Sequence, residues 1–340
     1  MIYKRKLGDT SMRILLDPAK NYYKANLHCH STFSDGKRSP EEIKKAYMDR
    51  GYSVVAYTDH EHVIPHPELC DENFVALTGC ELSIKENPTA STLTAKTMKV
   101  VHINLYAKEI DNGVTPCYST VQDHFKREML EHLIKKDGEY SRTYSPECVN
   151  DIIRIAHERG FLASYNHAGW SLETAENYMR YEGFDFVEIY NHGCVTSGYR
   201  DDEHVFSDML MSGRRVYATA TDDNHNRADF DSPESDSFGG FVMINADALT
   251  YSSVMRALER GDFYASTGAY IYSIVRDGST VTVKTSPSSS ITLRTTFRHT
   301  DTVHDETGEM TEATFTLPSE STNFRIVVTS KDGKAYSQLY

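Results

Sequence analysis

Short apolar runs alternate with amphipathic stretches along the first three-quarters of the chain, and two of these stretches share one order. Ser39 and Ser145 are each followed by a proline and by an amphipathic run that stops at a glycine, which predicts two capped helices. Each predicted helix leads into an apolar strand whose end carries a histidine, His60 in the first segment and His167 in the second. This helix–strand order is the unit of a parallel α/β barrel, in which polar side chains gather at the C-terminal ends of the strands.

Further apolar runs follow the same plan, and several lead directly into a histidine or a carboxylate. An amphipathic stretch over 252–260 predicts a last helix, which stops at Gly261. We predict additional barrel strands over 74–77, 99–105, 184–190, 216–221 and 241–244.

The pattern changes after about residue 270. Short segments with strict alternation of apolar and polar residues follow, and polar turns separate them. This pattern is typical of a small antiparallel β-sandwich. We therefore predict two domains, a barrel over 1–270 and an all-β accessory domain over 271–340.

Composition places the chain among ordinary globular proteins and limits its partners. Of 340 residues, 39% are hydrophobic and 25% are charged, and no run approaches the roughly 18 apolar residues that span a bilayer. The net charge of −13 disfavours binding to long nucleic acids, which requires a basic face. The six cysteines include no Cys-x-x-Cys pair, which argues against a disulfide framework and favours a reducing compartment.

The start of the chain shows no signal peptide, because no apolar stretch follows its charged residues. We therefore expect a cytoplasmic protein. An exported protein whose leader had been removed would have the same sequence, so this alternative stays open, as does the oligomeric state.

Histidines and carboxylates recur near the ends of the predicted strands. Alternate residues of a strand point to one side, so the imidazoles of His28 and His30 are expected to converge, as ligands of zinc, iron or manganese do. Random placement would spread the fifteen histidines over helices and loops. His124, His132, His157 and His204 are expected on helix surfaces. The candidate metal ligands are His28, His30, Asp35, His60, Glu81, His102, His167, His192, Asp223 and His225.

The ordered motifs of this set resemble the polymerase and histidinol phosphatase (PHP) family. The motifs are His28-x-His30 with Asp35, Thr58-Asp59-His60, Gly79-Cys80-Glu81, His102, Asn166-His167-Ala168-Gly169 and Asp223-Asn224-His225. The resemblance implies a distorted, TIM-like (β/α)7 barrel that holds two or three divalent ions and usually hydrolyses phosphoesters. The expected fold class is therefore α/β, with this PHP barrel followed by the small antiparallel β-sandwich.

Carried over residue by residue, the family pattern implies metal sites that share ligands. Glu81 would bridge the first site to the second. Glu81, Asp223 and His192 would take part in catalysis, although His192 would be either a ligand or a substrate contact. The first site would use His28, His30, Glu81 and Asp223, the second Glu81, His102 and His167, and the third Asp35, His60 and His225.

Physical chemistry agrees with a phosphate substrate. Three divalent ions would supply about +6 against about −3 from their carboxylates, and bound cations can lower the pKa of water to about 7. The chain departs from the fuller basic lining of some family members. Arg227 is the first expected phosphate contact, because a guanidinium fork matches phosphate oxygens, and Lys37 and Arg38 are the next candidates.

Three other residues have open roles. Asp59 and Asp222, each beside an expected ligand, would either orient imidazoles or cap backbone amides. Trp170, the one tryptophan, would stack on substrate or pack against the barrel rim.

The leading prediction is a metal-dependent phosphoesterase that hydrolyses a small phosphorylated substrate, a phosphomonoester or a nucleotide-like molecule, with a metal-activated hydroxide. A metal-dependent amidohydrolase or deaminase is one alternative, because such enzymes also begin with His-x-His on a barrel strand. A binding protein with an inactive barrel is another. The complete ligand set argues against an inactive barrel.

Overall fold

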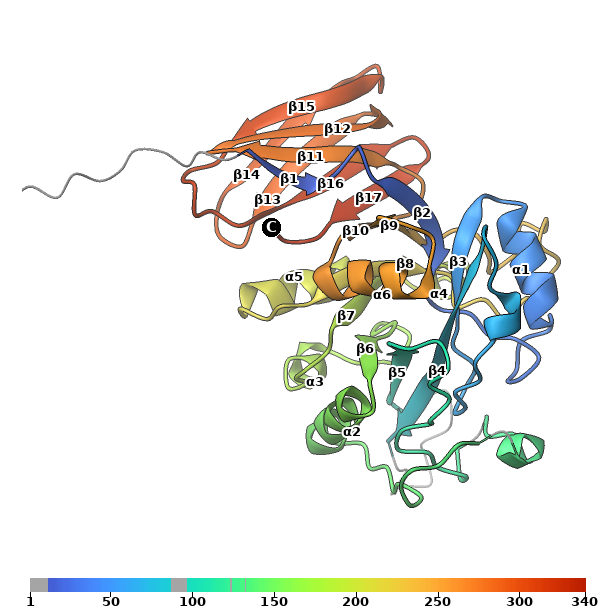
Figure 1. Ribbon diagram of the computed structural model, residues 1–340. Helices are drawn as coiled ribbons and strands as arrows, with labels where there is room; N and C mark the ends of the chain where they lie inside the picture. Colours follow the sequence, from blue (N-terminus) through green and yellow to red (C-terminus); the bar gives the residue numbers. More distant parts are fainter. Residues whose placement is uncertain (1–11, 87–96, 123, 132) are drawn as a thin grey trace, which may run out of the picture. The chain divides into compact units, whose positions relative to one another are not determined.

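The computed structural model describes residues 12–86, 97–122, 124–131 and 133–340, which form two compact units (Figure 1). The larger unit spans Asn21–Thr267, and the smaller unit combines the described residues up to Lys20 with Gly268–Tyr340. The sequence analysis assigned the beginning of the chain to the barrel. In the structure, strand β1 (Arg13–Leu16) pairs antiparallel with β11 (Ile271–Asp277), so the beginning of the chain belongs to the smaller unit.

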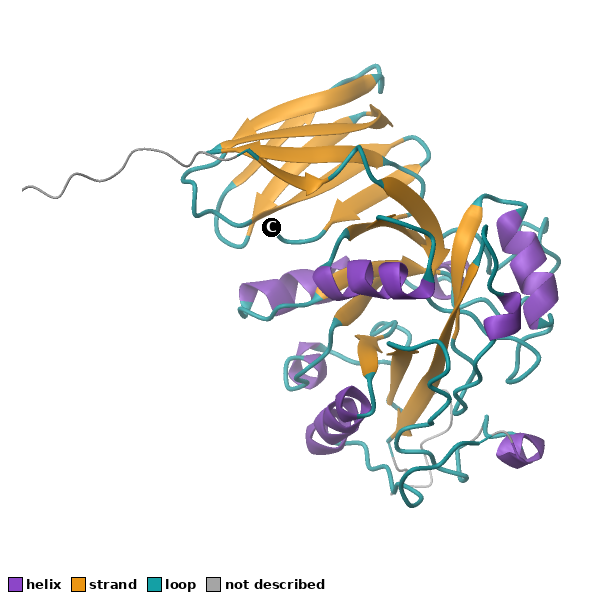
Figure 2. Ribbon diagram, viewed as in Figure 1, coloured by secondary structure: helices purple, strands orange, loops and turns teal. Residues whose placement is uncertain are grey.

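The larger unit is built on a mixed sheet with few helices (Figure 2). Each predicted strand of this unit is present, although β4 continues well beyond its predicted end and carries Glu81 within it. The strand order is β10 (Phe263–Ser266), β9 (Phe241–Ala246), β2 (Asn21–Asn26), β3 (Tyr52–Tyr57), β4 (Val75–Lys85), β5 (Val100–Ala107), β6 (Phe161–Tyr165), β7 (Phe186–Asn191) and β8 (Tyr217–Thr221).

Strand directions in this sheet differ from a uniformly parallel barrel. β2, β3 and β4 run parallel to one another, as do β6, β7 and β8, but β5 is antiparallel to both of its neighbours. β9, predicted as a barrel strand, pairs antiparallel with β2 and with β10. Beyond the ends of β8 and β2, Cys29 and Asn224 form a parallel bridge, with His30 N donating to Asn224 O at 3.0 Å.

Helices pack against individual strands of this sheet, and their starts agree with the sequence. Ser39 forms a capping box with Glu42 ahead of α1, and Ser145 Oγ accepts from Cys148 N ahead of α2. Among the described residues, no helix has the length and apolar character needed to cross a membrane. The helices are α1 (Pro40–Met48), α2 (Pro146–Glu158), α3 (Ala175–Tyr178), α4 (His192–Thr196), α5 (Glu203–Met211) and α6 (Tyr251–Arg260), with 3-10 turns at Pro67–Leu69 and Arg127–Glu131.

The core of the larger unit lies between the sheet and α6. Val254 and Leu258 of α6 are fully buried in a cluster with strand residues such as Leu27, Val54 and Ile244. Burial of each such side chain contributes about 1.5–3 kcal/mol. Packing in this core fixes the strands. The polar residues at the ends of the strands lie outside the core and form the site. All six cysteines are free, as expected.

The smaller unit consists of two antiparallel sheets that bury alternate residues. One sheet has the order β1, β11, β12 and β15, and the other contains β14, β13, β16 and β17. Val281, Val283, Ile291 and Leu293 are fully buried, whereas the residues between them are more exposed. The remaining strands are β12 (Thr280–Ser288), β13 (Ser290–Thr295), β14 (Thr300–His304), β15 (Met310–Thr316), β16 (Phe324–Ser330) and β17 (Gly333–Ser337).

The end of α6 depends on a glycine for two reasons. Gly261 has φ of 73°, and a Cβ added there would lie 2.3 Å from Tyr217 Cε1. Gly213 has a similar φ of 85° but open space around it.

We predict that Gly213→Ala lowers the free energy of unfolding by about 1 kcal/mol and Gly261→Ala by about 2–4 kcal/mol, because overpacking adds to backbone strain. Urea denaturation of both variants measures this, and equal losses would contradict the packing argument.

Candidate metal centre

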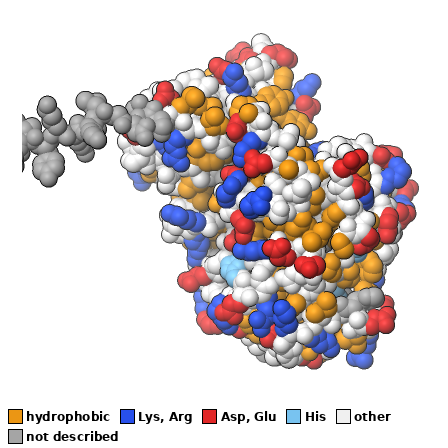
Figure 3. Space-filling view, in the orientation of Figure 1, with side chains coloured by type: hydrophobic (Ala, Val, Ile, Leu, Met, Phe, Trp, Pro, Cys, Tyr) orange, Lys and Arg blue, Asp and Glu red, His pale blue; other side chains and the backbone are white. Residues whose placement is uncertain are grey.

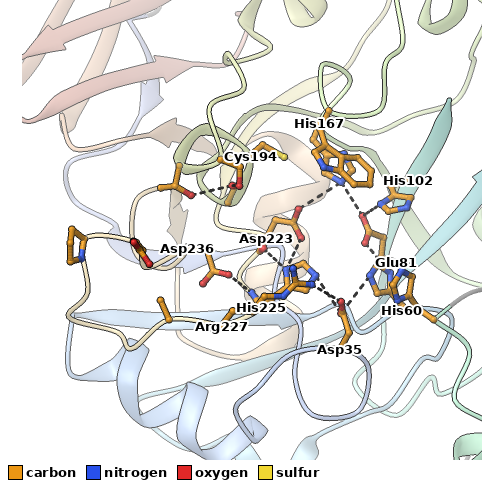
Figure 4. Close-up of a pocket in the computed structure, with 18 residues that line it drawn as sticks. Asp35, His60, Glu81, His102, His167, Cys194, Asp223, His225, Arg227 and Asp236 are labelled. Carbon is orange, nitrogen blue, oxygen red and sulfur yellow. Dashed lines mark hydrogen bonds and ion pairs between the residues drawn. The ribbon is translucent and has the colours of Figure 1, made fainter. Parts of the chain in front are cut away.

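Nine of the ten predicted ligands come together in the larger unit. Figure 4 labels those that line the pocket: Asp35, His60, Glu81, His102, His167, Asp223 and His225. Glu81 and His102 lie within strands and not at the ends of parallel strands. The second half of β4 pairs antiparallel with β5, and Glu81 and His102 both lie in this paired segment. The nine residues are His28 and His30 after β2, Asp35 in the loop that follows, His60 after β3, Glu81 in β4, His102 in β5, His167 after β6, and Asp223 and His225 after β8.

The first group consists of His28, His30, Glu81 and Asp223. The Nε2 atoms of His28 and His30 lie 3.2 Å apart, and they lie 3.1 and 3.0 Å from Asp223 Oδ1. Glu81 completes the group, with Oε1 3.3 Å from His28 Nε2 and Oε2 3.4 Å from His30 Nε2. Two imidazoles and two carboxylates that converge on one point form a donor set suited to a divalent transition metal.

The second group shares Glu81 with the first. Glu81 Oε1 lies 3.1 Å from His102 Nδ1 and 3.3 Å from His167 Nε2. Asn166 Nδ2 donates to the same oxygen at 2.9 Å, which fixes the rotamer of the carboxylate. Oε1 faces His102 and His167 as well as His28, whereas Oε2 faces His30, so the Glu81 carboxylate belongs to both groups.

The third group consists of Asp35, His60 and His225, with His30 beside them. Asp35 Oδ1 lies 3.3 Å from His225 Nε2 and 3.7 Å from His60 Nε2. Asp35 Oδ1 and His60 Nδ1 are buried and make no hydrogen bond to the described residues. Each faces another candidate ligand, since Asp35 Oδ1 lies near His225 and His60 Nδ1 lies 3.2 Å from Glu81 Oε2. An ion bound between such donors would give these buried atoms a partner.

Hydrogen bonds on the outer side of the rings orient the imidazoles. His28 Nδ1 lies 3.0 Å from Glu188 Oε1, His167 Nδ1 3.3 Å from Ser171 Oγ, and His225 Nδ1 3.0 Å from the carbonyl of Asp223. When Nδ1 donates outward, Nε2 keeps its lone pair toward the cluster. The residues present therefore fit divalent metal ions.

The charges of the cluster are strongly coupled. Burial disfavours the ionised form of Glu81, but the imidazoles of His102 and His28 outweigh it and hold the pKa of Glu81 well below its usual value. Burial likewise opposes the charged form of His30, yet Asp223 and Glu81 raise its pKa to about 10. For His60, burial dominates, and the neighbouring His30 adds to it, so the pKa of His60 is well below its usual value.

Three non-glycine residues of the site have positive φ. The values are 66° at Glu61, 27° at His167 and 52° at Asp223. Such backbone costs on the order of 1–3 kcal/mol per residue and persists where the surroundings hold it. Here Glu61 N donates to Glu81 O, His167 N to Glu188 Oε2, and Asp223 N to His28 O. The strained turns are thus fixed by the same residues that form the cluster.

Asp59 and Asp222 cap backbone amides, which was one of the two roles expected. Asp59 accepts from the backbone and side chain of Ser31 and of Ser34 at 2.6–2.9 Å. Asp222 accepts from the backbone N–H groups of residues 238–240 at 2.8–2.9 Å and from Tyr47 Oη at 2.7 Å. These carboxylates hold the loops that carry the ligands.

His192 is the one predicted ligand that the structure does not bring to the others. It is the first residue of α4, its Nδ1 lies 3.1 Å from Tyr190 Oη, and its ring fills the space beside Gly239. It belongs to none of the metal-type groups found among the described residues. The helix starts one residue after β7 ends, and this turns the side chain away from the cluster.

Glu188, on the same strand as Asn191, is the residue of β7 that lies among the ligand candidates, where His192 had been expected. It is 2% exposed and, with His28 and His167, forms a further metal-type group. Its Oε2 also accepts from Asn191 Nδ2 at 2.9 Å. Sequence reasoning did not include Glu188 among the ligands, although an acidic residue in the middle of an apolar strand is itself a signal of a partnered buried charge.

The cluster opens into a pocket of about 670 Å³. Of the three expected phosphate contacts, only Arg227 lines this pocket, with Nη2 3.2 Å from Asp35 Oδ2. Lys37 is exposed, and Arg38 pairs with Asp229 at 2.9 Å. Trp170 also lines the pocket, 39% exposed, with its ring centroid 5.0 Å from that of His167.

Four histidines were expected on helix surfaces, and their outcomes differ. His157 lies on α2 and His204 on α5, as expected, whereas His132 lies outside the described residues. The expectation was wrong for His124. It lies in a turn, lines the pocket and stacks on His60, because the predicted helix around it is replaced by turns.

No protein-family model matches the chain, and a search of curated proteins found no match. Among solved structures, the chain is similar to a two-domain protein of Bacteroides vulgatus that contains a predicted PHP-like metal-dependent phosphoesterase, at 16% identity over 96% of each chain, with a TM-score of 0.47. A protein of Bifidobacterium adolescentis assigned as a metal-dependent phosphoesterase (15% identity, 59% of this chain, 87% of that chain, TM-score 0.37) is another. A third is an amidohydrolase of Chromobacterium violaceum (18% identity, 59% of this chain, 87% of that chain, TM-score 0.34). At these identities and TM-scores the likeness concerns the fold alone.

We predict that Glu188→Gln weakens metal binding about 10–100-fold without unfolding the protein. Glutamine has an NH2 group in place of one carboxylate oxygen, so it would place an N–H against at least one of the groups that now donate to Glu188. We expect this contact between two donors to rotate the His28 imidazole away from its present orientation. Calorimetric titration of metal-free protein with Mn²⁺ measures the change.

Glu173→Gln is the matched control for this prediction. Glu173 is also a buried glutamate, but it accepts from Tyr144, Tyr165 and Tyr181 at 2.5–2.6 Å and belongs to none of the groups. Its substitution is expected to leave Mn²⁺ affinity unchanged. Equal affinities in the Glu188→Gln and wild-type proteins would show that this carboxylate does not orient the ligands.

Proposed function

We propose that the larger unit is a metal-dependent phosphoesterase of the PHP type, which hydrolyses a small phosphorylated substrate. One observation carries the proposal: three of the four metal-type groups found among the described residues adjoin one another beside one pocket, with Glu81 common to two of these three and His30 common to two. A single structural ion needs only four closed ligands. Adjoining groups that open into a pocket are typical of phosphoester hydrolysis.

The proposed ligands follow the groups found in the structure. His28, His30, Glu81 and Asp223 would hold one ion, and Glu81, His102 and His167 a second. Asp35, His60 and His225 would hold a third. Glu81 and Asp223 are the proposed catalytic carboxylates. We leave His192 out of the set, because its ring lies against Tyr190 and Gly239.

Divalent ions bound here would supply Lewis acidity toward the phosphoryl oxygens and would acidify a water for attack on phosphorus. The chain's own residues would do the rest. Arg227, 69% exposed and paired with Asp35, would turn its guanidinium from that carboxylate to the substrate phosphate. Glu188 and Asn166 would keep the ligand side chains in their rotamers throughout.

We also propose that β2–β8 close into the distorted seven-stranded barrel expected from the sequence. The Cys29–Asn224 bridge supports closure, since it links the extension of β2 to that of β8. The smaller unit would be an accessory domain. On the face drawn in Figure 3, basic side chains are interspersed with acidic ones, which agrees with a small substrate rather than a long polyanion.

We predict that purified protein supplied with Mn²⁺, Zn²⁺ or Fe²⁺ releases p-nitrophenol from p-nitrophenyl phosphate. Asp223→Ala and His28→Ala are each expected to remove bound metal and to lower kcat/KM at least about a hundredfold, because each removes a ligand of the first group. Elemental analysis and the chromogenic assay measure the two effects.

His192→Ala is the matched control, a histidine near the cluster that is expected to keep full metal content. Amide and nucleoside substrates belong in the same panel, since turnover of these alone would favour the amidohydrolase alternative. The proposal fails if no metal supports hydrolysis of any phosphoester and Asp223→Ala retains its metal.

A further inference from the structure

His124 is a pocket residue that belongs to none of the expected motifs. Its ring stacks on that of His60, with centroids 4.4 Å apart and planes 20° from parallel. It lines the same pocket as Asp35 and Arg227. The residues around His124 in the sequence do not predict that it lies at the pocket. The turn that carries His124 belongs to a loop that is far from the candidate ligands along the chain.

Contacts on its C-terminal side hold His124 beside the pocket. The ring of the next residue, Phe125, stacks on the buried His62 at 4.5 Å, and Lys126 Nζ donates to Thr32 O at 2.8 Å. These contacts anchor the turn to the loops that follow β3 and β2. They place the backbone of the turn, and the exposed imidazole of His124 then stacks on His60.

Further along the same loop, a buried ion pair fixes the chain to the site. Arg142 and Glu61 are each 1% exposed, and their two nitrogen–oxygen distances are 2.8 Å. Arg142 also donates to the carbonyls of Ser83 and Cys117 at 2.8 Å. Breaking such a pair leaves a buried charge without a partner, which strongly disfavours movement of the loop.

The structure argues against His124 as a metal ligand. The described residues contain four metal-type groups, and His124 is in none of them, although the ring of the ligand candidate His60 is its stacking partner. It stands beside the third group rather than within it. Among the described residues, none forms a hydrogen bond with its ring nitrogens, so these nitrogens can serve a molecule in the pocket.

We propose that His124 is a substrate-binding residue, which donates its imidazole N–H to a phosphoryl oxygen of the ester. A neutral imidazole always carries one N–H donor, so the contact requires no change of protonation. Arg227 contacts Asp35 and His124 stacks on His60, so the two donors border the same group of side chains. This inference rests on the proposed phosphoesterase function and names a residue that would recognise its substrate.

Two substitutions separate hydrogen bonding from stacking. His124→Phe keeps a ring against His60 but has no donor, whereas His124→Gln keeps an N–H donor but loses the ring. With inorganic phosphate as the probe and Mn²⁺-loaded protein, calorimetry is expected to show affinity about ten- to a hundredfold weaker for His124→Phe. His124→Gln is expected to keep most of the affinity.

Metal content and a remote control complete the test. Both variants are expected to bind as much Mn²⁺ as the wild type, and His157→Ala, which alters a surface histidine on α2, is expected to bind phosphate normally. The inference is overturned if His124→Phe binds phosphate as the wild type does, if only His124→Gln is weakened, or if either variant loses metal. It is also overturned if the wild type binds no phosphate.

Kinetics distinguish this inference from the function on which it rests. With p-nitrophenyl phosphate, His124→Phe is expected to raise KM about tenfold or more, while His124→Gln stays near the wild type. If the wild type turns over phosphoesters and His124→Phe has unchanged KM and kcat, the function stands and the role of His124 falls. If no metal supports hydrolysis of any phosphoester by the wild type and Asp223→Ala retains its metal, the function itself falls.

Discussion

A buried carboxylate, that of Glu81, is the constraint on which the site depends. It is 1% exposed, and an ionised group at that depth costs several kcal/mol unless opposite charges or hydrogen bonds surround it. His28, His102 and His167 all lie within 3.3 Å of its oxygens. These partners come from β5 and from the segments after β2 and β6, so satisfying one charge brings three separate segments to a single point beside β4.

Carboxylates near the cluster perform different tasks, which their surroundings decide. Glu188 faces His28 and the backbone of His167, and so it orients ligands. Asp59 and Asp222 face backbone amides instead, and they hold the loops after β2 and before β9. Each accepts several hydrogen bonds, which offset the cost of burying its carboxylate. The candidate ligands are thus placed by a second layer of acids that need not touch an ion.

The two kinds of polar residue in the pocket come from different parts of the fold. Most ligand candidates lie on strands or directly after them, where the backbone is fixed by the sheet. Arg227, His124 and Trp170 come from loops and turns at the pocket wall. In such folds the rigid strands usually position the chemical groups and the loops form the pocket wall, because the sequences of loops vary more easily than those of strands. Substrate choice would therefore reside in the loops.

The sequence by itself determined the features that depend on neighbours in the chain. N-cap bonds act over three residues and strand faces alternate, so the helix starts at Ser39 and Ser145 and the convergence of His28 with His30 were predictable. Tertiary structure alone decided the antiparallel course of β5, the pairing of β1 with β11, the exclusion of His192 and the inclusion of His124. These depend on contacts between distant segments, and no local pattern encodes which segments meet.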